Sequence, residues 1–419
     1  IGPARGGGVS ETSREGDAPE VLSAAWCADH FDHMHPLVGR NLQDTLATLR
    51  AGGGLTHSDQ YGGFWVATGY EEVLAIAQDW ESFSSEHGIT VPSGQTSVPA
   101  IPEQLDPPRH REFKRLINAH FTPAVVLERE ADTRALVTEL IDDVIEAGEC
   151  DFMAAVAKPL PSRVFVEMVL HAPASETAEI TRLANVASTP TTQEGREARG
   201  AMLRWINDFV DRRRGQEPIG DVVDAVIAAE IEGRPIEQTE IVGVLQLLLF
   251  GGLDTTAGAL GQMMVRFCRE PELVTYLREH PERLNDAVEE LLRLDSSFIF
   301  IGRTATRDVE VAGKQIQAGD RVLISWAAAN RDEGEFACPF AFDLERESNR
   351  HIAFGAGPHR CAGSNLARMN LRIAVREIVE RFDDLRLADD DVRFHSLYSR
   401  APVAVPITFR PGPRLGPAA

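Results

Sequence analysis

One segment of the chain, residues 237–269, constrains the fold more than any other. It reads EQTEIVGVLQLLLFGGLDTTAGALGQMMVRFCR and carries apolar residues on nearly every face of an α-helix. At 1.5 Å per residue, a helix of this length would be about 50 Å long. Because a helix that is apolar all round has to be buried, the segment is predicted to cross the core of the protein.

Composition predicts a soluble, cytoplasmic protein with no nucleic-acid or membrane partner. The longest apolar run, IVGVLQLLLFGGL, is too short and too often interrupted by glycine to predict a membrane span, and the start of the chain does not resemble a signal peptide. The formal net charge of -22 disfavours nucleic acids and anionic membranes, since both require a basic surface. The five cysteines lie far apart and form no CxxC pair, which is typical of reduced thiols in a cytoplasm.

Helical periodicity dominates the rest of the chain, with a few short strand patterns. We therefore expect a mainly α protein with small peripheral β-sheets. The segments FWVAT, DVEVAG and RVLISWAA alternate as strands do. Residues 1–20 are small and polar and predict a disordered tail or an expression remnant, whereas 21–419 contains no linker and predicts a single domain. Further helices are predicted at 41–50, 70–78, 110–119, 125–147, 194–214, 271–280 and 281–294.

The motif GGLDTT, residues 251–256, lies in the middle of the long helix. Two adjacent glycines cost about 1 kcal/mol each relative to alanine inside a helix, and Asp and Thr compete locally for backbone hydrogen bonds. One interpretation is a close helix crossing, with Thr255 bonded to the carbonyl four residues before it. The other is a ligand site, in which Gly251 leaves room for a small molecule while Asp254 and Thr255 deliver protons to it. The motif alone leaves both open.

A second unusual segment, HIAFGAGPHRCAG, places a single thiol in a glycine-rich loop. Gly355, Gly357 and Gly363 would let the backbone fold tightly and direct N–H groups at the sulfur of Cys361. The amphipathic helix predicted after the loop would add its dipole, and such surroundings favour a thiolate that ligates a metal. Two other interpretations remain: a buried free cysteine, and a zinc site with the two histidines of the loop, although the spacing matches no common zinc motif.

Together these motifs resemble those of the cytochrome P450 family. FGAGPHRCAG is similar to the haem-binding signature of that family, EELLR to its Glu-x-x-Arg pair, and GGLDTT to its oxygen-activating helix. Their order and spacing agree with the family over nearly the whole chain after residue 30. The resemblance implies the cytochrome P450 fold, with the long helix crossing over the haem. FWVATGYEEV, FSSE and DPPRHREFKRL look most like the soluble bacterial branch that includes camphor hydroxylase.

The resemblance also implies a cofactor, haem b (iron protoporphyrin IX). Cys361 would supply the axial thiolate, and Asp254 and Thr255 would pass protons to bound oxygen. Basic residues would hold the haem propionates, and among them Lys114 departs from the arginine usual in the family and lacks its planar fork. The positions that match haem contacts of the family are His110, Lys114, Gly251, Arg303, Phe354, Gly355, His359, Cys361 and Gly363.

Glu290 and Arg293 form the pair within EELLR. Their spacing places them on one face of a helix, where an exposed pair would contribute only a few tenths of a kcal/mol. The resemblance instead implies a buried structural pair. In the family an arginine or histidine joins the pair, here from FACPFAFDLERESNR, and the sequence does not say which residue it is.

The substrate pocket is expected beneath an irregular loop, residues 82–105, and between mostly apolar walls. No arginine occurs in the expected wall segments, which favours a neutral apolar molecule, terpenoid-like or polycyclic, over an acid. Phe298 fits the core equally well, since aromatic residues in apolar runs usually pack inward. The expected wall residues are Leu247, Phe250, Phe298, Ile299 and Leu397.

The predicted activity is hydroxylation of a C–H bond, in which one atom of O2 is inserted and the other is reduced to water. The sequence shows no flavin or iron–sulfur motif, so the two electrons are expected from a separate ferredoxin and ferredoxin reductase. A basic patch of Arg109, Lys114, Arg115 and Arg360 is predicted to receive the ferredoxin. A peroxide-driven peroxygenase, which the Asp–Thr pair of GGLDTT disfavours, and a haem-binding carrier or sensor are the alternatives.

Overall fold

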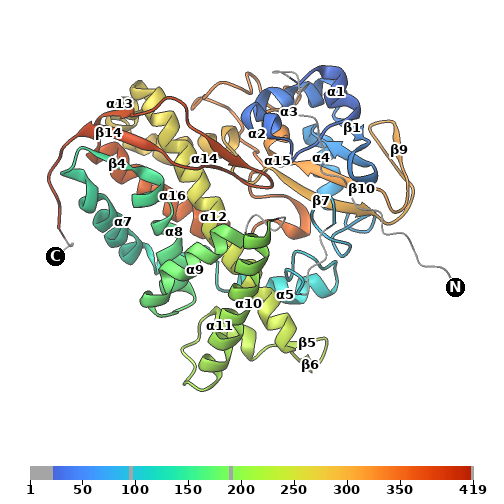
Figure 1. Cartoon of the computed structure of the whole chain (residues 1–419), viewed down its shortest axis with the longest axis horizontal. Coiled ribbons are helices and arrows are strands. Elements are labelled where there is room, and N and C mark those ends of the chain that lie inside the picture. Colours follow the sequence, from blue (N-terminus) through green and yellow to red (C-terminus); the bar gives the residue numbers. More distant parts are fainter. Residues whose placement is uncertain (1–21, 94–97, 188–191, 417–419) are drawn as a thin grey trace, which may run out of the picture.

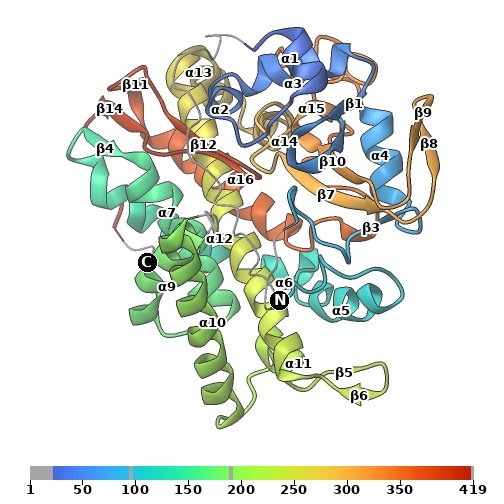
Figure 2. The ribbon, with the colours of Figure 1, turned by 45° about the vertical axis from the view of Figure 1, so that its right-hand side comes forward.

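A long helix, α12 (Gln238–Arg269), runs through the middle of the molecule. The structure is a computed structural model that describes residues 22–93, 98–187 and 192–416. In both views a helix-rich part lies on one side of α12 and the largest sheet on the other (Figure 1 and Figure 2). The prediction for the long helix is therefore confirmed to within one residue. The tail predicted at 1–20 lies outside the described residues.

The two ends of α12 follow the usual rules for helix termini. At its start Glu237 and Glu240 form a reciprocal capping box, and Arg266 and Arg269 lie in its last turn, where cations complement the helix dipole. By length and apolar composition α12 is long enough to cross a membrane. However, 61% of its most apolar window is buried inside the protein, as expected for a core helix.

The remaining elements are short by comparison. The other α-helices are α1 (Ala24–Asp29), α2 (Pro36–Arg40), α3 (Leu42–Ala51), α4 (Tyr70–Gln78), α5 (Arg109–Asn118), α6 (Pro123–Leu127), α7 (Glu130–Ile145), α8 (Pro159–Arg163), α9 (Ala174–Ala187), α10 (Gln193–Arg214), α11 (Val222–Ile227), α13 (Pro271–Glu279), α14 (Leu284–Leu294), α15 (Trp326–Ala329) and α16 (Ser364–Arg381). The strands are β1 (Leu55–Ser58), β2 (Phe64–Ala67), β3 (Phe83–Ser84), β4 (Glu149–Asp151), β5 (Glu230–Ile231), β6 (Arg234–Pro235), β7 (Phe300–Ala305), β8 (Val309–Val311), β9 (Lys314–Ile316), β10 (Arg321–Ser325), β11 (Asp383–Leu387), β12 (Phe394–Ser396), β13 (Arg400–Pro402) and β14 (Pro406–Arg410).

The largest sheet has five strands in the order β1-β2-β10-β7-β3. Its strand β10 pairs antiparallel with β7 and parallel with β2, and all of β7 is buried. On β10, Val322 and Ile324 belong to one hydrophobic cluster and Leu323 to another, so the alternation of side chains places a core on each face of the sheet. The other sheets have two or three strands, which confirms the predicted class, mainly α with small sheets.

Three predicted elements differ from those observed. The helix expected at 125–147 is broken into α6 and α7, and at the break the Arg129 side chain donates hydrogen bonds to the carbonyls of Val125 and Met168. The helix expected at 281–294 starts with a 3-10 turn, so that α14 begins at Leu284. The strand RVLISWAA ends at Ser325, whose side chain caps α15 by accepting from the Ala328 N–H.

Candidate active site

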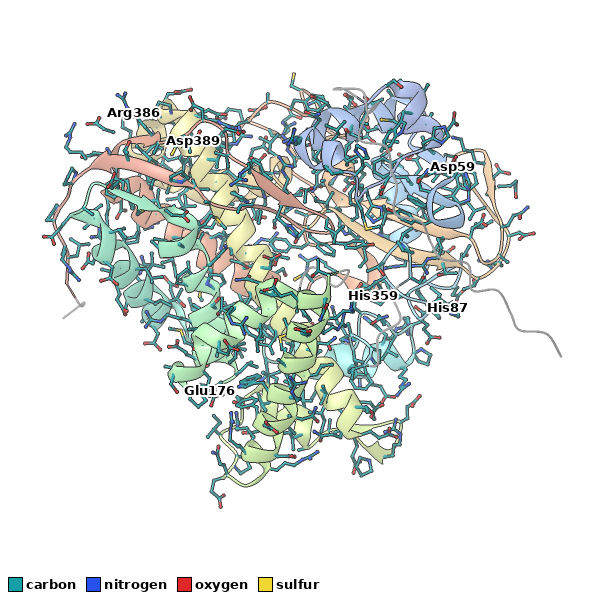
Figure 3. The ribbon with its side chains drawn as sticks, viewed as in Figure 1. Asp59, His87, Glu176, His359, Arg386 and Asp389 are labelled. Atoms are coloured by element: carbon teal, nitrogen blue, oxygen red, sulfur yellow. The ribbon has the colours of Figure 1, made fainter. Side chains whose placement is uncertain are left out.

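A cavity of ≈ 840 Å³ is lined by α12, the cysteine loop, β7 and residues of the predicted loop 82–105. This volume lies in the range of small-molecule sites, about 300–1,000 Å³. His359, one of its lining residues, lies near the middle of the molecule (Figure 3). The predicted site residues that line the cavity are Lys114, Leu247, Phe250, Gly251, Thr255, Phe298, Arg303, Phe354, Gly355, His359, Cys361, Gly363 and Leu397. The fold thus brings together residues that are up to 283 positions apart, from Lys114 to Leu397.

Three predicted residues are not among those lining the cavity. Ile299 is fully buried in the cluster beside the large sheet and is not among the residues that line the cavity, unlike the prediction. Asp254 accepts a hydrogen bond of 2.8 Å from the Ser399 hydroxyl. His110 lies behind His359, with ring centroids 4.3 Å apart.

The cysteine loop depends on two glycines with left-handed backbone. Gly355 has φ +73° and Gly357 has φ +68°, conformations that other residues rarely adopt. A Cβ at Gly357 would lie only 2.3 Å from the carbonyl oxygen of Ala77, so the loop packs directly on the end of α4. The loop is closed by the Cys361 N–H, which donates to the Phe354 carbonyl at 2.8 Å. The left-handed backbone at these two positions agrees with the predicted tight folding of the loop.

The sulfur of Cys361 faces the cavity and has positive neighbours. Burial raises the pKa of the Cys361 thiol, while the Lys114 ammonium and the Gly363 N–H act in the opposite direction. The net direction differs from the predicted stabilisation of a thiolate, because desolvation by the surrounding protein is the larger effect. The helix α16 begins only at Ser364, so Cys361 precedes it by three residues and is not at its first turn.

The GGLDTT motif faces the cysteine loop across the cavity. Its Thr255 hydroxyl donates to the Gly251 carbonyl at 2.9 Å, which is the backbone contact that the structural interpretation predicted. Thr255 also lines the cavity, so the ligand-site interpretation stays a prediction that is compatible with this backbone contact. The two glycines serve different purposes. A Cβ at Gly251 would meet nothing within 4 Å, whereas one at Gly252 would lie 2.6 Å from the Phe165 ring.

Basic side chains gather at the cysteine-loop end of the cavity. Arg303 is buried, and its guanidinium lies 3.6 Å from Glu103. His359 lies 3.6 Å from the other oxygen of Glu103, which is also too far for a hydrogen bond. Burial by itself would raise the pKa of the Glu103 carboxyl, but His359, Arg303 and Lys114 outweigh it and hold the pKa at about 2. Glu103 was not predicted from the sequence, where nothing distinguishes it from a loop carboxylate.

The donors of this cluster fit the propionates of a haem. The Nδ1 atom of His359 has no hydrogen-bond partner among the described residues, nor has either ring nitrogen of the buried His110. Burial, together with the positive charges of His359 and Lys114, lowers the pKa of His110 to about 3. Lys114 donates a hydrogen bond of 2.6 Å to the Arg360 carbonyl. Buried polar groups without partners are costly, so these atoms are poised for an anionic ligand.

Glu290 and Arg293 form the buried pair that the family resemblance implies. Their side chains are at most 1% exposed, and the Arg293 Nη2 lies 2.7 Å from Glu290. Arg293 also donates to the carbonyls of Asn330, Pro339 and Ala341. Arg346 approaches the same carboxylate at 3.3 Å. The partner that the sequence left unassigned is therefore Arg346.

The wall of the cavity contains arginines that sequence reasoning missed. Arg196 and Arg199 line it from α10, a helix that was predicted but not assigned to the pocket. The argument that an apolar wall without arginine favours a neutral substrate therefore fails. No local signal could have shown this, because the two residues reach the cavity only when α10 packs across α12.

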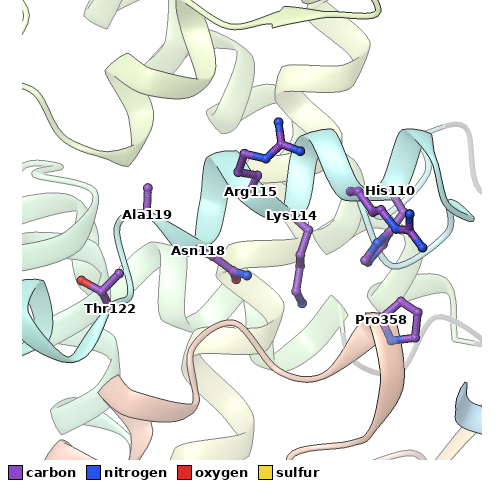
Figure 4. Close-up of a pocket in the computed structure, with 8 residues that line it drawn as sticks. His110, Lys114, Arg115, Asn118, Ala119, Thr122 and Pro358 are labelled. Atoms are coloured by element: carbon purple, nitrogen blue, oxygen red, sulfur yellow. The ribbon is translucent and has the colours of Figure 1, made fainter.

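The outer side of α5 carries part of the predicted basic patch. A surface pocket is lined there by Arg111, Lys114 and Arg115 together with Pro358 of the cysteine loop (Figure 4). Lys114 points toward the cysteine loop. Arg109, which was also predicted to belong to the basic patch, forms ion pairs with Glu232 and Glu240.

These features define a haem-thiolate protein. A tight glycine loop presents a thiol to the cavity, a helix with a glycine leaves space beside it, and hydrogen-bond donors that fit carboxylates lie next to it. A family model described as Cytochrome P450 matches residues 163–394, more than half of the chain. The chain is 32% identical over 369 residues to the steroid C26-monooxygenase of Mycobacterium tuberculosis, with 84% of this chain and 97% of that protein covered. It is 36% identical over 368 residues to nocardicin C N-oxygenase of Nocardia uniformis, with 82% and 89% covered. The chain therefore belongs to the cytochrome P450 family.

Solved structures agree with this assignment. Cytochrome P450 CYP109Q5 from Chondromyces apiculatus superposes with a TM-score of 0.82 at 27% sequence identity, and the match covers 92% of this chain and 99% of that one. The predicted fold is confirmed. The protein is accordingly an oxidoreductase, a monooxygenase that carries haem b and uses O2 with electrons from a redox partner. The closeness to the camphor-hydroxylase branch stays a prediction.

Proposed function

We propose that this protein hydroxylates a C–H bond of a small to medium, mainly apolar molecule of terpenoid-like or polycyclic size. The observation that carries the proposal is the placement of Cys361 and Thr255 on the wall of one largely apolar cavity. Relatives named for a steroid and for nocardicin fit the size range but act on different molecules, so they do not identify the substrate. Residues 21–419 act as a single domain, located in the cytoplasm.

Cys361 is the residue whose thiolate would hold the haem iron. When bound, the haem would supply the activation of O2. Gly363 contributes its N–H to the sulfur, and Phe354 lines the cavity on the side of the cysteine loop. The propionates would be held by Arg303, His359, Lys114 and His110, whose donors are described above.

Thr255 is the proposed proton donor on the α12 side. Its hydroxyl is oriented by the Gly251 carbonyl, and the open space over Gly251 leaves room for a small molecule beside it. The carboxylate of Asp254 is held by Ser399 outside the cavity wall. Asp254 would supply protons to Thr255 only after that hydrogen bond is exchanged, so it acts as a gated member of the relay.

A separate ferredoxin, reduced by a ferredoxin reductase, is the proposed electron source. The surface of α5 and the cysteine loop presents Arg111, Arg115 and Arg360 within an otherwise acidic chain. Such a local basic surface attracts an acidic redox protein, and encounters of this kind are weak and small. Arg109 is left out of the patch because two glutamates neutralise it.

The first test is the absorbance spectrum of the purified holoprotein, reduced with dithionite and exposed to carbon monoxide, next to Cys361→Ala. A strongly red-shifted Soret band in the parent and its absence in the variant are expected. Product that forms with ferredoxin, its reductase and O2, and not with peroxide alone, supports the monooxygenase over the peroxygenase. A protein that binds haem and apolar ligands without any turnover would be the carrier or sensor instead.

A further inference from the structure

An arginine of α10 that has no acidic partner among the described residues lines the cavity. Arg199 of α10 is half-buried, and its guanidinium lies 5.9 Å from the centroid of the Phe250 ring. Burial lowers the pKa of Arg199, and no carboxylate of the described residues contributes an opposing effect. Because guanidinium stays charged in proteins, this is a partly desolvated cation that faces a ligand space.

A second polar group, which has no hydrogen-bond partner among the described residues, also lines the cavity. Gln246 of α12 is 1% exposed and lines the cavity. Neither its amide nitrogen nor its amide oxygen has a hydrogen-bond partner among the described residues. Gln246 and Phe250 are four residues apart on one face of α12, so Arg199, Phe250 and Gln246 form one continuous surface.

The charge balance of the cavity is opposite to that of the chain. Among the described lining residues, Glu103 is the one carboxylate, and Arg303 and His359 already flank it at the cysteine-loop end. No acidic residue of the described wall pairs with Arg199. A protein with a net charge of -22 therefore keeps a positive end in its substrate cavity.

We propose that the substrate is an apolar monocarboxylic acid whose carboxylate binds Arg199, with Gln246 donating a hydrogen bond from its amide. This inference rests on the proposed function and narrows its substrate class. Arg199 supplies the charge and Gln246 satisfies an otherwise unpaired buried amide, while Leu247 and Phe250 contact the apolar body. Gln246 precedes Thr255 by nine residues, roughly 13 Å along a helix. Oxidation is therefore expected on the part of the molecule away from the carboxylate.

The experiment compares acids with their neutral esters. The holoprotein is titrated with dodecanoate and methyl dodecanoate, and with abietate and methyl abietate, and binding is followed by the spin-state shift and by calorimetry. Whichever of the two acids binds the parent more tightly is expected to bind at least about ten-fold more tightly than its own methyl ester. A hydrogen bond to a charged group contributes enough binding free energy for a difference of this size. Arg199→Gln should weaken the acid about 10- to 100-fold and leave the ester unchanged.

Matched variants separate charge recognition from packing. Arg199→Lys keeps the positive charge and should retain most of the preference for the acid over its ester. Gln246→Leu should lower this preference. Arg204→Gln, on the exposed side of the same helix, should behave as the parent. The proposal is wrong if no acid binds more tightly than its ester, or if Arg199→Gln weakens acid and ester equally, as loss of packing on Phe250 would. If either result is obtained with protein that shows the red-shifted Soret band with carbon monoxide, this inference alone is wrong. If that band is absent, the proposed function is wrong.

Discussion

At the scale of single residues, the glycines of the cysteine loop differ in why glycine is needed. Gly357 combines a left-handed φ of +68° with a backbone contact that leaves no room for a Cβ. Gly363 has an ordinary φ of -80°, and a Cβ there would lie 3.9 Å from the Cys361 sulfur. The sequence motif treats both as equivalent, but only the first is required by the backbone.

We therefore expect Gly357→Ala to destabilise the protein and to reduce its haem content. The left-handed conformation alone costs about 1–2 kcal/mol for a residue with a Cβ, and the contact with the Ala77 carbonyl adds to it. The measurement is the haem-to-protein ratio together with the thermal unfolding midpoint. Gly363→Ala is the control and should stay close to the parent in both. Equal losses in the two variants would contradict the explanation by backbone geometry.

At the scale of elements, the pair on α14 connects that helix to the segment that precedes the cysteine loop. Glu290 accepts from Arg293 and Arg346, and also from the Asn349 side chain at 3.2 Å and the Asp343 N–H at 3.1 Å. The three charged side chains of this network are at most 7% exposed. Removal of one charge would therefore leave the opposite charges buried and unpaired.

Glu290→Gln is expected to lower the free energy of unfolding by about 3–5 kcal/mol, because two buried guanidinium groups lose their counter-charge. Urea unfolding of the parent and the variant measures the difference. Glu279→Gln, at an exposed position on the neighbouring α13, is the matched control and should change stability by less than about 0.5 kcal/mol. A Glu290→Gln protein as stable as the control would show that the network contributes nothing net.

The elements also show where sequence reasoning succeeds and where it stops. Local pattern was sufficient for α12 and α4, whose periodicity agrees with burial over their whole length. Local pattern was insufficient at Arg129. The side chain of Arg129 donates hydrogen bonds to carbonyls of two different segments, and the helix ends there although the apolar periodicity continues. The π-helical segments Met153–Ala157 and Val164–Val169 were not predicted either, since their apolar pattern does not distinguish them from α-helix.

The same division applies to the site. Cys361 and Thr255 were found because their motifs are local and break ordinary rules for loops and helices. Glu103, Arg199 and Gln246 were missed because none of them belongs to a recognisable motif in its own segment. Their place in the site depends on residues that are distant in the sequence and close in the fold. A cavity wall assembled from distant helices has no signature in any one of them.

At the scale of the whole molecule, stability in acid depends on carboxylates spread over distant parts of the fold. Arg234 hydrogen-bonds Glu240 and holds its pKa at about 2 at the start of α12. Burial opposes ionisation of Glu289, but His351 and Arg368 outweigh it and give a pKa of about 2 between α14 and α16. Glu103 has the same pKa in the cavity. Burial raises the pKa of Glu377, which acts in the opposite direction.

The sign of the pH dependence follows from these directions. A folded-state pKa below the ordinary value of 4.5 means that the unfolded chain binds more protons than the folded one between pH 4.5 and about pH 2. The stability that these carboxylates contribute is therefore present above this window and lost as pH falls through it. We expect the urea midpoint of the parent to fall steeply from about pH 5 to pH 2. Glu240→Gln should be less stable than the parent at pH 7, because Arg234 and Arg109 each lose their closest carboxylate, and it should lose less stability on acidification. Glu279 has no described ion pair, so in Glu279→Gln the urea midpoint should change with pH as it does in the parent. If the urea midpoint of Glu240→Gln also changed with pH as in the parent, acid unfolding would depend on other carboxylates of the molecule.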